Sequence, residues 1–87
     1  MSRFLASISV TLKPTVNDPE GLTITSALHN LGFSGVAGVR SGKLFEVTIE
    51  ATSSEEAQSL AEEMCTRLLA NPVMERYSCR IAPEEQT

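Results

Sequence analysis

The chain has 87 residues, of which 7 are basic and 11 are acidic, so its formal net charge at pH 7 is −4. This balance argues against a nucleic-acid-binding surface, which needs clustered positive charge to neutralise phosphates. A single domain of this size has a small core. Its two cysteines have no metal-ligand spacing, so we expect oligomerisation to provide further stability.

The first predicted element is a strand over residues 4–13, where apolar and mostly polar side chains alternate with a period of two. Pro14 ends it, because proline cannot donate to a sheet ladder. The N-terminal segment, which runs from Met1 directly into this strand, has no continuous apolar run of the kind found in signal peptides or membrane spans. We therefore expect a cytoplasmic protein with reduced thiols.

A helix is predicted to begin after Asp18, whose carboxylate can cap free N–H groups, with Pro19 at the first helical position. Gly32 is predicted to end this helix as a C-terminal cap. An amphipathic stripe is formed at i, i+3, i+4 and i+7 by Ile24, Ala27, Leu28 and Leu31.

Two further strands are predicted over residues 36–40 and 44–50, joined by the two-residue turn Ser41-Gly42 of a β-hairpin. In this interpretation Gly42 provides a positive φ.

The second helix is predicted to open at Ser53, which can form a capping box with Glu56. Asn71-Pro72 ends it, with Asn71 tolerating the left-handed conformation of a helix end. The predicted buried stripe consists of Ala57, Leu60, Ala61, Met64 and Leu68, with Cys65 and Leu69 as further candidates. The last predicted strand is outlined by Val73, Tyr77, Cys79 and Ile81.

The order β-α-β-β-α-β predicts an α+β, ferredoxin-like sandwich, with two helices on one face of a four-stranded antiparallel sheet. We expect one domain over residues 1–82 and a polar tail over residues 83–87. The uncovered sheet face suits either association between sheets or plain solvation. On it we place Leu5, Ser7, Ser9 and Thr11 beside Leu44, Glu46 and Thr48.

No residues have the spacing of a catalytic or metal site. His29 lies in the last turn of the first helix, where the helix dipole favours it, with contact to a partner as the other interpretation. Cys65 and Cys79 fit buried positions as small hydrophobes. Residues 38–43 lack the spacing and the hydroxyl residue of a phosphate-binding loop. The acidic residues Glu55, Glu56, Glu62 and Glu63 fit a solvated helix face.

Three segments together resemble the small PurS subunit of phosphoribosylformylglycinamidine synthase. The first comprises Val10-Thr11-Leu12-Lys13, Asp18-Pro19-Glu20-Gly21 and Ala27-Leu28-His29. The second is Val39-Arg40-Ser41-Gly42-Lys43 with Glu46. The third runs from Met64 to Val73 and continues with Glu75 and Tyr77. The resemblance covers about residues 4 to 81.

The resemblance implies a non-catalytic subunit without a cofactor or metal of its own. It would form a homodimer or a dimer of dimers, and bridge a large synthetase subunit, which uses ATP and Mg²⁺, and a glutaminase subunit in purine biosynthesis. Ammonia from glutamine would pass between these two.

Interface candidates follow from this resemblance: Arg40, Lys43, Glu46, His29, Asn71 and Glu75. Arg40 and Lys43 would dock on an acidic patch of the large subunit, or simply form a polar hairpin tip. Glu46, on the open sheet face, would pair with a basic group across the dimer, because an unpaired carboxylate at an interface is costly. Structural roles are assigned to Asp18, Pro19, Gly21 and Gly42, the first three at the start of the helix.

Two other functions remain open. The first is a regulatory domain that binds a small metabolite at a homo-oligomer interface, which predicts thermal stabilisation by the ligand alone. The second is a stand-alone hydrolase, which predicts turnover by the purified chain.

Overall fold

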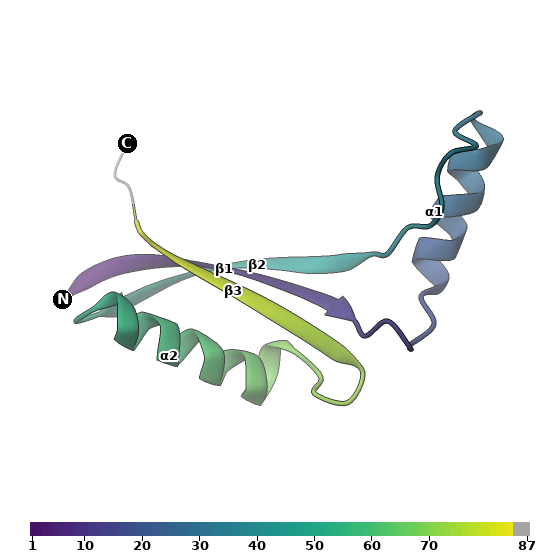
Figure 1. Ribbon diagram of the computed structural model, residues 1–87. Coiled ribbons are helices and arrows are strands. Elements are labelled where there is room, and N and C mark those ends of the chain that lie inside the picture. Colours follow the sequence, from purple (N-terminus) through teal and green to yellow (C-terminus); the bar gives the residue numbers. More distant parts are fainter. Residues whose placement is uncertain (85–87) are drawn as a thin grey trace.

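A three-stranded antiparallel sheet with one helix on its face forms the centre of the molecule (Figure 1). The computed structural model describes residues 1–84. In chain order its elements are β1 (Ser2–Leu12), α1 (Pro19–Asn30), β2 (Gly42–Ala51), α2 (Ser54–Met64), the π-helical turn η1 (Cys65–Leu69) and β3 (Glu75–Pro83).

Strand β1 is the middle strand, and its partners pair with it in the order β2-β1-β3. Ile8 lies opposite Phe45 on β2 and Cys79 on β3. The alternation predicted for the first strand is confirmed, because every second residue from Phe4 to Val10 is buried on one face. Burying Ile8 and Val10 contributes about 1.5–3 kcal/mol each to the free energy of unfolding.

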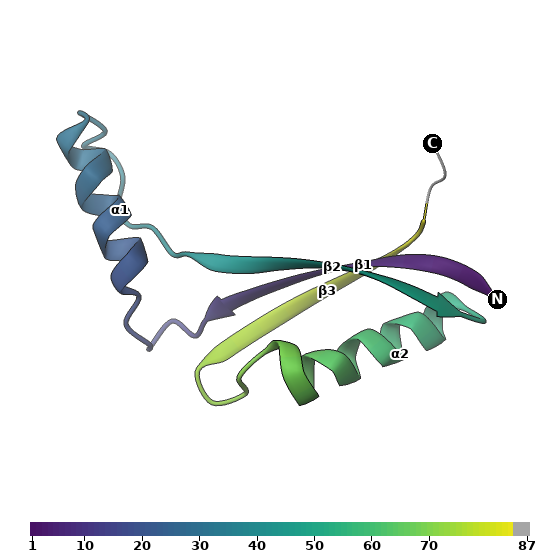
Figure 2. The same ribbon diagram turned by 180° about the vertical axis from the view of Figure 1, so that it is seen from behind.

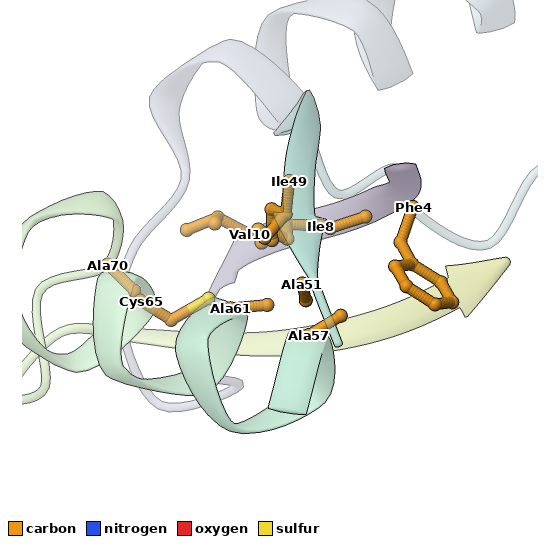
Figure 3. Close-up of a cluster of buried hydrophobic side chains, with 10 residues drawn as sticks. Phe4, Ile8, Val10, Ile49, Ala51, Ala57, Ala61, Cys65 and Ala70 are labelled. Carbon is orange, nitrogen blue, oxygen red and sulfur yellow. The ribbon is translucent and has the colours of Figure 1, made fainter. Parts of the chain in front are cut away.

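Helix α2 covers this apolar face through small side chains. Ala57, Ala61 and Cys65 recur every fourth residue and are fully buried against the sheet (Figure 3). The helix begins as predicted at Ser53, whose hydroxyl accepts the Glu56 N–H at 3.1 Å. The Glu56 carboxylate, however, accepts from the N–H and hydroxyl of Thr52, one residue before the position that a capping box requires.

The prediction that Leu68 is buried is wrong, because its side chain is 83% exposed. Helix α2 continues into η1, where the Ala70 N–H donates to the Cys65 carbonyl five residues earlier. The extra residue in this turn rotates the following side chains about the helix axis. Leu69 therefore packs against the core, whereas Leu68 points outward.

Helix α1 projects away from the sheet, as both views show (Figures 1 and 2). Its caps are as predicted: Asp18 caps the start, and Gly32 adopts a φ of 98° after the end. Its amphipathic stripe does not pack on the sheet of its own chain, and Gly21 is its only buried residue. The radius of gyration is 16.6 Å, whereas about 12 Å is expected for a compact domain of this length.

The predicted strand over residues 36–40 does not form, so there is no hairpin at Ser41-Gly42 and no fourth strand in the described chain. The α+β class is confirmed, but the four-stranded sheet with two covering helices is not. Residues 36–40 run back from α1, and Arg40 and Ser41 bond to the segment that precedes that helix. These bonds take the place of a sheet ladder.

Gly42 does not have the predicted positive φ. It begins β2, opposite Thr11, and a Cβ at this position would lie 2.6 Å from the Val10 carbonyl oxygen. The close approach of two strands therefore requires glycine here.

Strand β3 differs from the prediction at both ends. Val73 lies before it and is 77% exposed, and the strand continues to Pro83, inside the predicted tail. The rest of that tail, residues 85–87, lies outside the described residues. Asn71 has no left-handed conformation. Its side-chain oxygen instead accepts from the N–H groups of Val73 and Met74 in the turn before β3.

Candidate partner-binding surfaces

The Asp18 carboxylate joins the two segments that connect α1 to the sheet. It accepts hydrogen bonds from the N–H of Gly21 at 2.9 Å and from the N–H of Ser41 at 2.7 Å, and the Ser41 hydroxyl adds bonds of 3.0 and 3.2 Å. Asp18 is only 3% exposed. The predicted cap thus has a second function, because it fixes the chain leaving α1 beside the chain entering it.

These hydrogen bonds stabilise the ionised carboxylate. The backbone N–H of Ser41, followed by that of Gly21, lowers the pKa of Asp18 below its ordinary value of 3.8. Asp18 is therefore a structural anion at neutral pH. Gly21 fits the same junction, because a Cβ there would collide with the Val39 carbonyl oxygen.

Arg40 belongs to this junction and not to a hairpin tip. Its guanidinium donates to the carbonyl oxygens of Lys13 and Val16 at 2.9 and 3.0 Å. Lys43, which the sequence grouped with Arg40, is exposed on β2 opposite Val10. The structure therefore separates the two predicted docking residues, and only Lys43 leaves its charge available at the surface.

His29 lies in the last turn of α1, as predicted. Its Nε2 donates to the carbonyl oxygen of Val36 at 2.7 Å, which places the ring proton on that nitrogen. The imidazole therefore ties the loop after the helix back onto it, a role that sequence reasoning did not identify.

Asn71 and Glu75 bond to each other. The Asn71 N–H donates to the Glu75 carboxylate at 2.8 Å, and the Glu75 N–H donates to the Asn71 carbonyl oxygen at 2.7 Å. Lys13 reaches the same turn through a 2.8 Å bond from its Nζ to the Pro72 carbonyl oxygen. The two predicted interface residues thus shape the connection from η1 to β3.

Cys65 is buried and Cys79 is half-buried, and both are free thiols. Burial raises the pKa of both thiols, so they stay protonated at neutral pH. This fits the prediction that they act as small hydrophobes. Among residues 1–84 no three His, Cys, Asp or Glu side chains are placed to hold a metal ion.

An apolar groove of about 500 Å³ runs between β2 and the helical segment formed by the C-terminal half of α2 and η1. Glu63 and Arg67 border it and bond to each other at 3.0 Å. Its apolar lining consists of Val47, Leu60, Met64, Leu68 and Leu69. Sequence reasoning missed this groove, because it assumed that the chain's own first helix would cover the sheet beside α2.

The opposite sheet face is open, and the pairing register confirms which residues lie on it. Leu5, Ser7 and Ser9 of β1 lie opposite Thr48, Glu46 and Leu44 of β2. Strand β3 contributes Arg80 beside Ser7. Arg80 was not among the predicted interface residues, although the alternation of Arg76, Ser78 and Arg80 with the apolar residues of the last strand was a signal for it.

The match to a family model decides the family. The model described as PurS, phosphoribosylformylglycinamidine (FGAM) synthase, matches residues 5–83. This chain belongs to the PurS family. The predicted resemblance is therefore confirmed. FGAM synthase is a ligase of purine biosynthesis, and PurS chains are one of its subunits.

Relatives match along almost the whole chain. The PurS subunit of Archaeoglobus fulgidus is 47% identical over 74 residues, which cover 85% of this chain and 92% of the relative. The crystal structure of Methanocaldococcus jannaschii PurS has a TM-score of 0.84 at 38% identity, and the match covers 94% of this chain and 99% of that one.

A PurS-family chain also occurs in a solved assembly. A chain in the structure of PurLQS from Thermotoga maritima has a TM-score of 0.87 at 34% identity, and the match covers 94% of this chain and 100% of that one. In the described part of the present chain, no helix is long and apolar enough to cross a membrane.

Proposed function

We propose that this chain is the non-catalytic assembly subunit of a cytoplasmic FGAM synthase. It bridges the ATP-dependent synthetase subunit and the glutaminase subunit so that ammonia passes between them. The observation that carries this proposal is the similarity, along the full length of the relative, to a chain of the PurLQS assembly. In this assignment ATP and Mg²⁺ are bound by the synthetase subunit.

The polar side chains that could act in catalysis already bond to groups of the same chain, which supports a non-catalytic role. The Asp18 carboxylate is fully occupied by Gly21 and Ser41, and the His29 imidazole is bonded to a backbone carbonyl. Both cysteines are held as neutral thiols by burial. Asp18 and His29 therefore hold the backbone in place and the two cysteines fill the core, which are structural roles.

The proposal includes a homodimer in which each copy places α1 in the apolar groove of the other. Two observations support this arrangement. The apolar stripe of α1 is exposed, by 38% at Ile24 and by 73% at Leu31, the residue that caps the helix, and a 12-residue helix without packing is marginal in water. The groove beside α2, where Leu68 is exposed, is apolar and borders the place on the sheet that a second helix occupies in a two-helix sandwich.

Reconstitution tests the bridging role. The chain is added to the synthetase and glutaminase subunits of the same organism, and amidine formation is followed with glutamine and, as the control, with ammonia. Glutamine-dependent activity is expected only with the chain present, whereas ammonia-dependent activity is expected to be unchanged by its addition. Equal glutamine-dependent activity without the chain would contradict the proposal.

A thermal-shift measurement distinguishes the assembly subunit from the alternative, a regulatory domain that binds a small metabolite. Nucleotides and glutamine are added to the isolated chain at concentrations far above their cellular levels. An assembly subunit keeps its melting temperature, whereas a metabolite sensor is stabilised by mass action, by about 2.7 kcal/mol at a ligand concentration 100 times the dissociation constant.

A further inference from the structure

Strand β3 is an edge strand, because within residues 1–84 it pairs only with β1. Two backbone hydrogen bonds show which of its groups face β1. Before the strand, the Met74 carbonyl oxygen accepts from the Lys13 N–H at 2.9 Å, and after it the Glu84 N–H donates to the Arg3 carbonyl oxygen at 3.1 Å. Since bonded and unbonded pairs alternate in an antiparallel ladder, the even-numbered residues between these two bonds are the ones that bond to β1.

The odd-numbered residues of β3 therefore direct their backbone groups outward. Tyr77, Cys79 and Ile81 each present an N–H and a C=O at the edge, and the described chain gives these groups no backbone partner. Pro83 has the same outward orientation but lacks an N–H, so the row ends there. The edge thus offers three donors and three acceptors in the pattern that an added strand completes.

Acidic side chains flank this edge on the side of the sheet that α2 covers. Helix α2 runs alongside β3, as both views show (Figures 1 and 2). A hollow of about 370 Å³ lies beside the edge, and its lining includes Glu55 and Gln58 of the helix and Ile81 of the strand. One turn further along the helix, the Glu62 carboxylate accepts from the Gln58 amide at 3.3 Å. Burial, followed by the negative charge of Glu62, raises the pKa of Cys79, so this carboxylate lies close to the middle of the edge.

Basic side chains flank the edge on the open sheet face. Arg76 and Arg80 lie on this face and are exposed, and Arg76 donates to the Thr11 hydroxyl at 3.4 Å. In the part of the chain that the structure describes, Arg80, Glu55 and Glu62 form no ion pair. The edge is therefore negative on the α2 side and positive on the open face.

A second copy of the chain fits this edge poorly. Two β3 strands pair antiparallel about a two-fold axis perpendicular to the sheet, which keeps both α2 helices on the same side. Glu62 then faces the acidic helix of the other copy and Arg80 faces its arginines, so like charges meet on both sides of the edge. The homodimer proposed above does not use this edge either, because the groove that receives α1 lies on the β2 side of α2. The edge is thus available to a different chain.

We propose that the free edge of β3 binds an extended segment of a partner subunit, in which basic and acidic side chains alternate. Successive residues of a strand point to opposite faces, so the basic side chains meet Glu55 and Glu62 and the acidic ones meet Arg80. Backbone hydrogen bonds attach the segment, and the charges select its register. The inference rests on the proposed bridging role and deepens it, because it names how the chain recognises a partner.

Residue-resolved amide hydrogen exchange, followed by mass spectrometry, tests the backbone pairing. It is measured for the isolated chain and after addition of the synthetase and glutaminase subunits, separately and together. The amides of Tyr77, Cys79 and Ile81 are expected to exchange rapidly in the isolated chain and at least about tenfold more slowly in a complex. The even-numbered residues of β3 are the internal reference, because their amides bond to β1 in both states.

Charge reversal tests the two sides of the edge separately. Glu62→Lys and Arg80→Glu are each expected to raise the Kd for the partner subunit by about tenfold at low salt, and by less at high salt. Glu50→Lys is the matched control, since it reverses the same charge on β2, at the opposite edge of the sheet, where Arg3 keeps Glu84 as a partner. Its Kd is expected to stay within about twofold of the wild type. Thermal unfolding and light scattering verify that all variants fold and dimerise.

The outcomes distinguish this proposal from the bridging role. Unchanged exchange at the β3 edge, in an assembly with glutamine-dependent activity, would overturn the edge pairing and leave the bridging role intact. Slow exchange of the outward amides in the isolated chain would assign the edge to a second copy and contradict the proposal. So would a Glu50→Lys variant as impaired as Glu62→Lys, because the charge effect would then not be confined to this edge. A chain that binds neither subunit would overturn both proposals.

Discussion

The Asp18 carboxylate accepts hydrogen bonds from both the backbone N–H and the hydroxyl of Ser41, which lies 23 residues further along the chain. This pair brings together the segment that leaves β1 and the segment that enters β2. Since α1 lies between these two segments, the Asp18–Ser41 contact sets the direction in which the helix leaves the sheet (Figure 1).

Replacing Asp18 separates its two functions. Asp18→Asn keeps a good helix cap but removes the negative charge and one acceptor oxygen, whereas Asp18→Ala removes the cap as well. We expect faster amide hydrogen exchange in α1 for both variants, and more for Asp18→Ala. The sheet core is the internal reference, because its amides should keep their wild-type rates. Equal amide exchange rates of α1 in the wild type and both variants would contradict a role of Asp18 in holding this helix.

The lowered pKa of Asp18 predicts a pH dependence of stability. Because its folded pKa lies below the unfolded value of about 3.9, the ionised carboxylate stabilises the fold above that value. This contribution is lost as the pH falls through the folded pKa. The difference in melting temperature between the wild type and Asp18→Asn should therefore be constant near neutral pH and shrink below about pH 4. A difference that grows on acidification would have the wrong sign.

Gly42 and Gly38 form a matched pair for testing close strand approach. Gly42→Ala places a Cβ 2.6 Å from the Val10 carbonyl oxygen, and we expect it to lower the free energy of unfolding by about 1–3 kcal/mol. Gly38→Ala meets no atom within 4 Å and is expected to be neutral or stabilising by about 0.4–1 kcal/mol. Denaturant unfolding of both variants measures the difference, and equal effects would argue against strand contact as the reason for glycine.

The α1 stripe is expected to determine homodimerisation. Ile24→Asp places a charge on the apolar face of the helix and should weaken the dimer by about tenfold or more. Ser26→Asp adds the same charge about 200° around the helix, outside the stripe, and should leave the dimer intact. Light scattering coupled to size-exclusion chromatography gives the masses. Dissociation by both variants would indicate a loss of helicity instead of a loss of contact.

Reciprocal exchange of α1 has a further consequence. Leu68→Asp, in the groove, should also dissociate the homodimer, because it charges the surface that receives the helix. Mixing it with Ile24→Asp should restore partial dimerisation. In the mixed dimer, the unaltered helix of the Leu68→Asp copy meets the unaltered groove of the Ile24→Asp copy. A mixture that stays monomeric would exclude this geometry.

Local patterns in the sequence predicted most elements of the fold. The alternation from Phe4 to Val10, the caps at Asp18 and Ser53, and Gly32 after the first helix are confirmed, because each depends on residues close to one another in the chain. The prediction of a strand over residues 36–40 was wrong, since Arg40 and Ser41 form hydrogen bonds with the segment before α1 in place of the hydrogen bonds of a sheet. The prediction that Leu68 is buried was wrong, because a π-helical turn leaves no evident pattern in the sequence.

The sequence by itself determined most of the elements, the open sheet face and the family, since strand alternation, helix caps and motif order are properties of neighbouring residues. Only the tertiary structure decided where those elements lie. It showed α1 away from the sheet, the groove that this leaves beside α2, and Arg80 across the sheet from Glu46. The physical reason is that strand register and long-range hydrogen bonds join residues far apart in the chain, and no local period encodes their pairing.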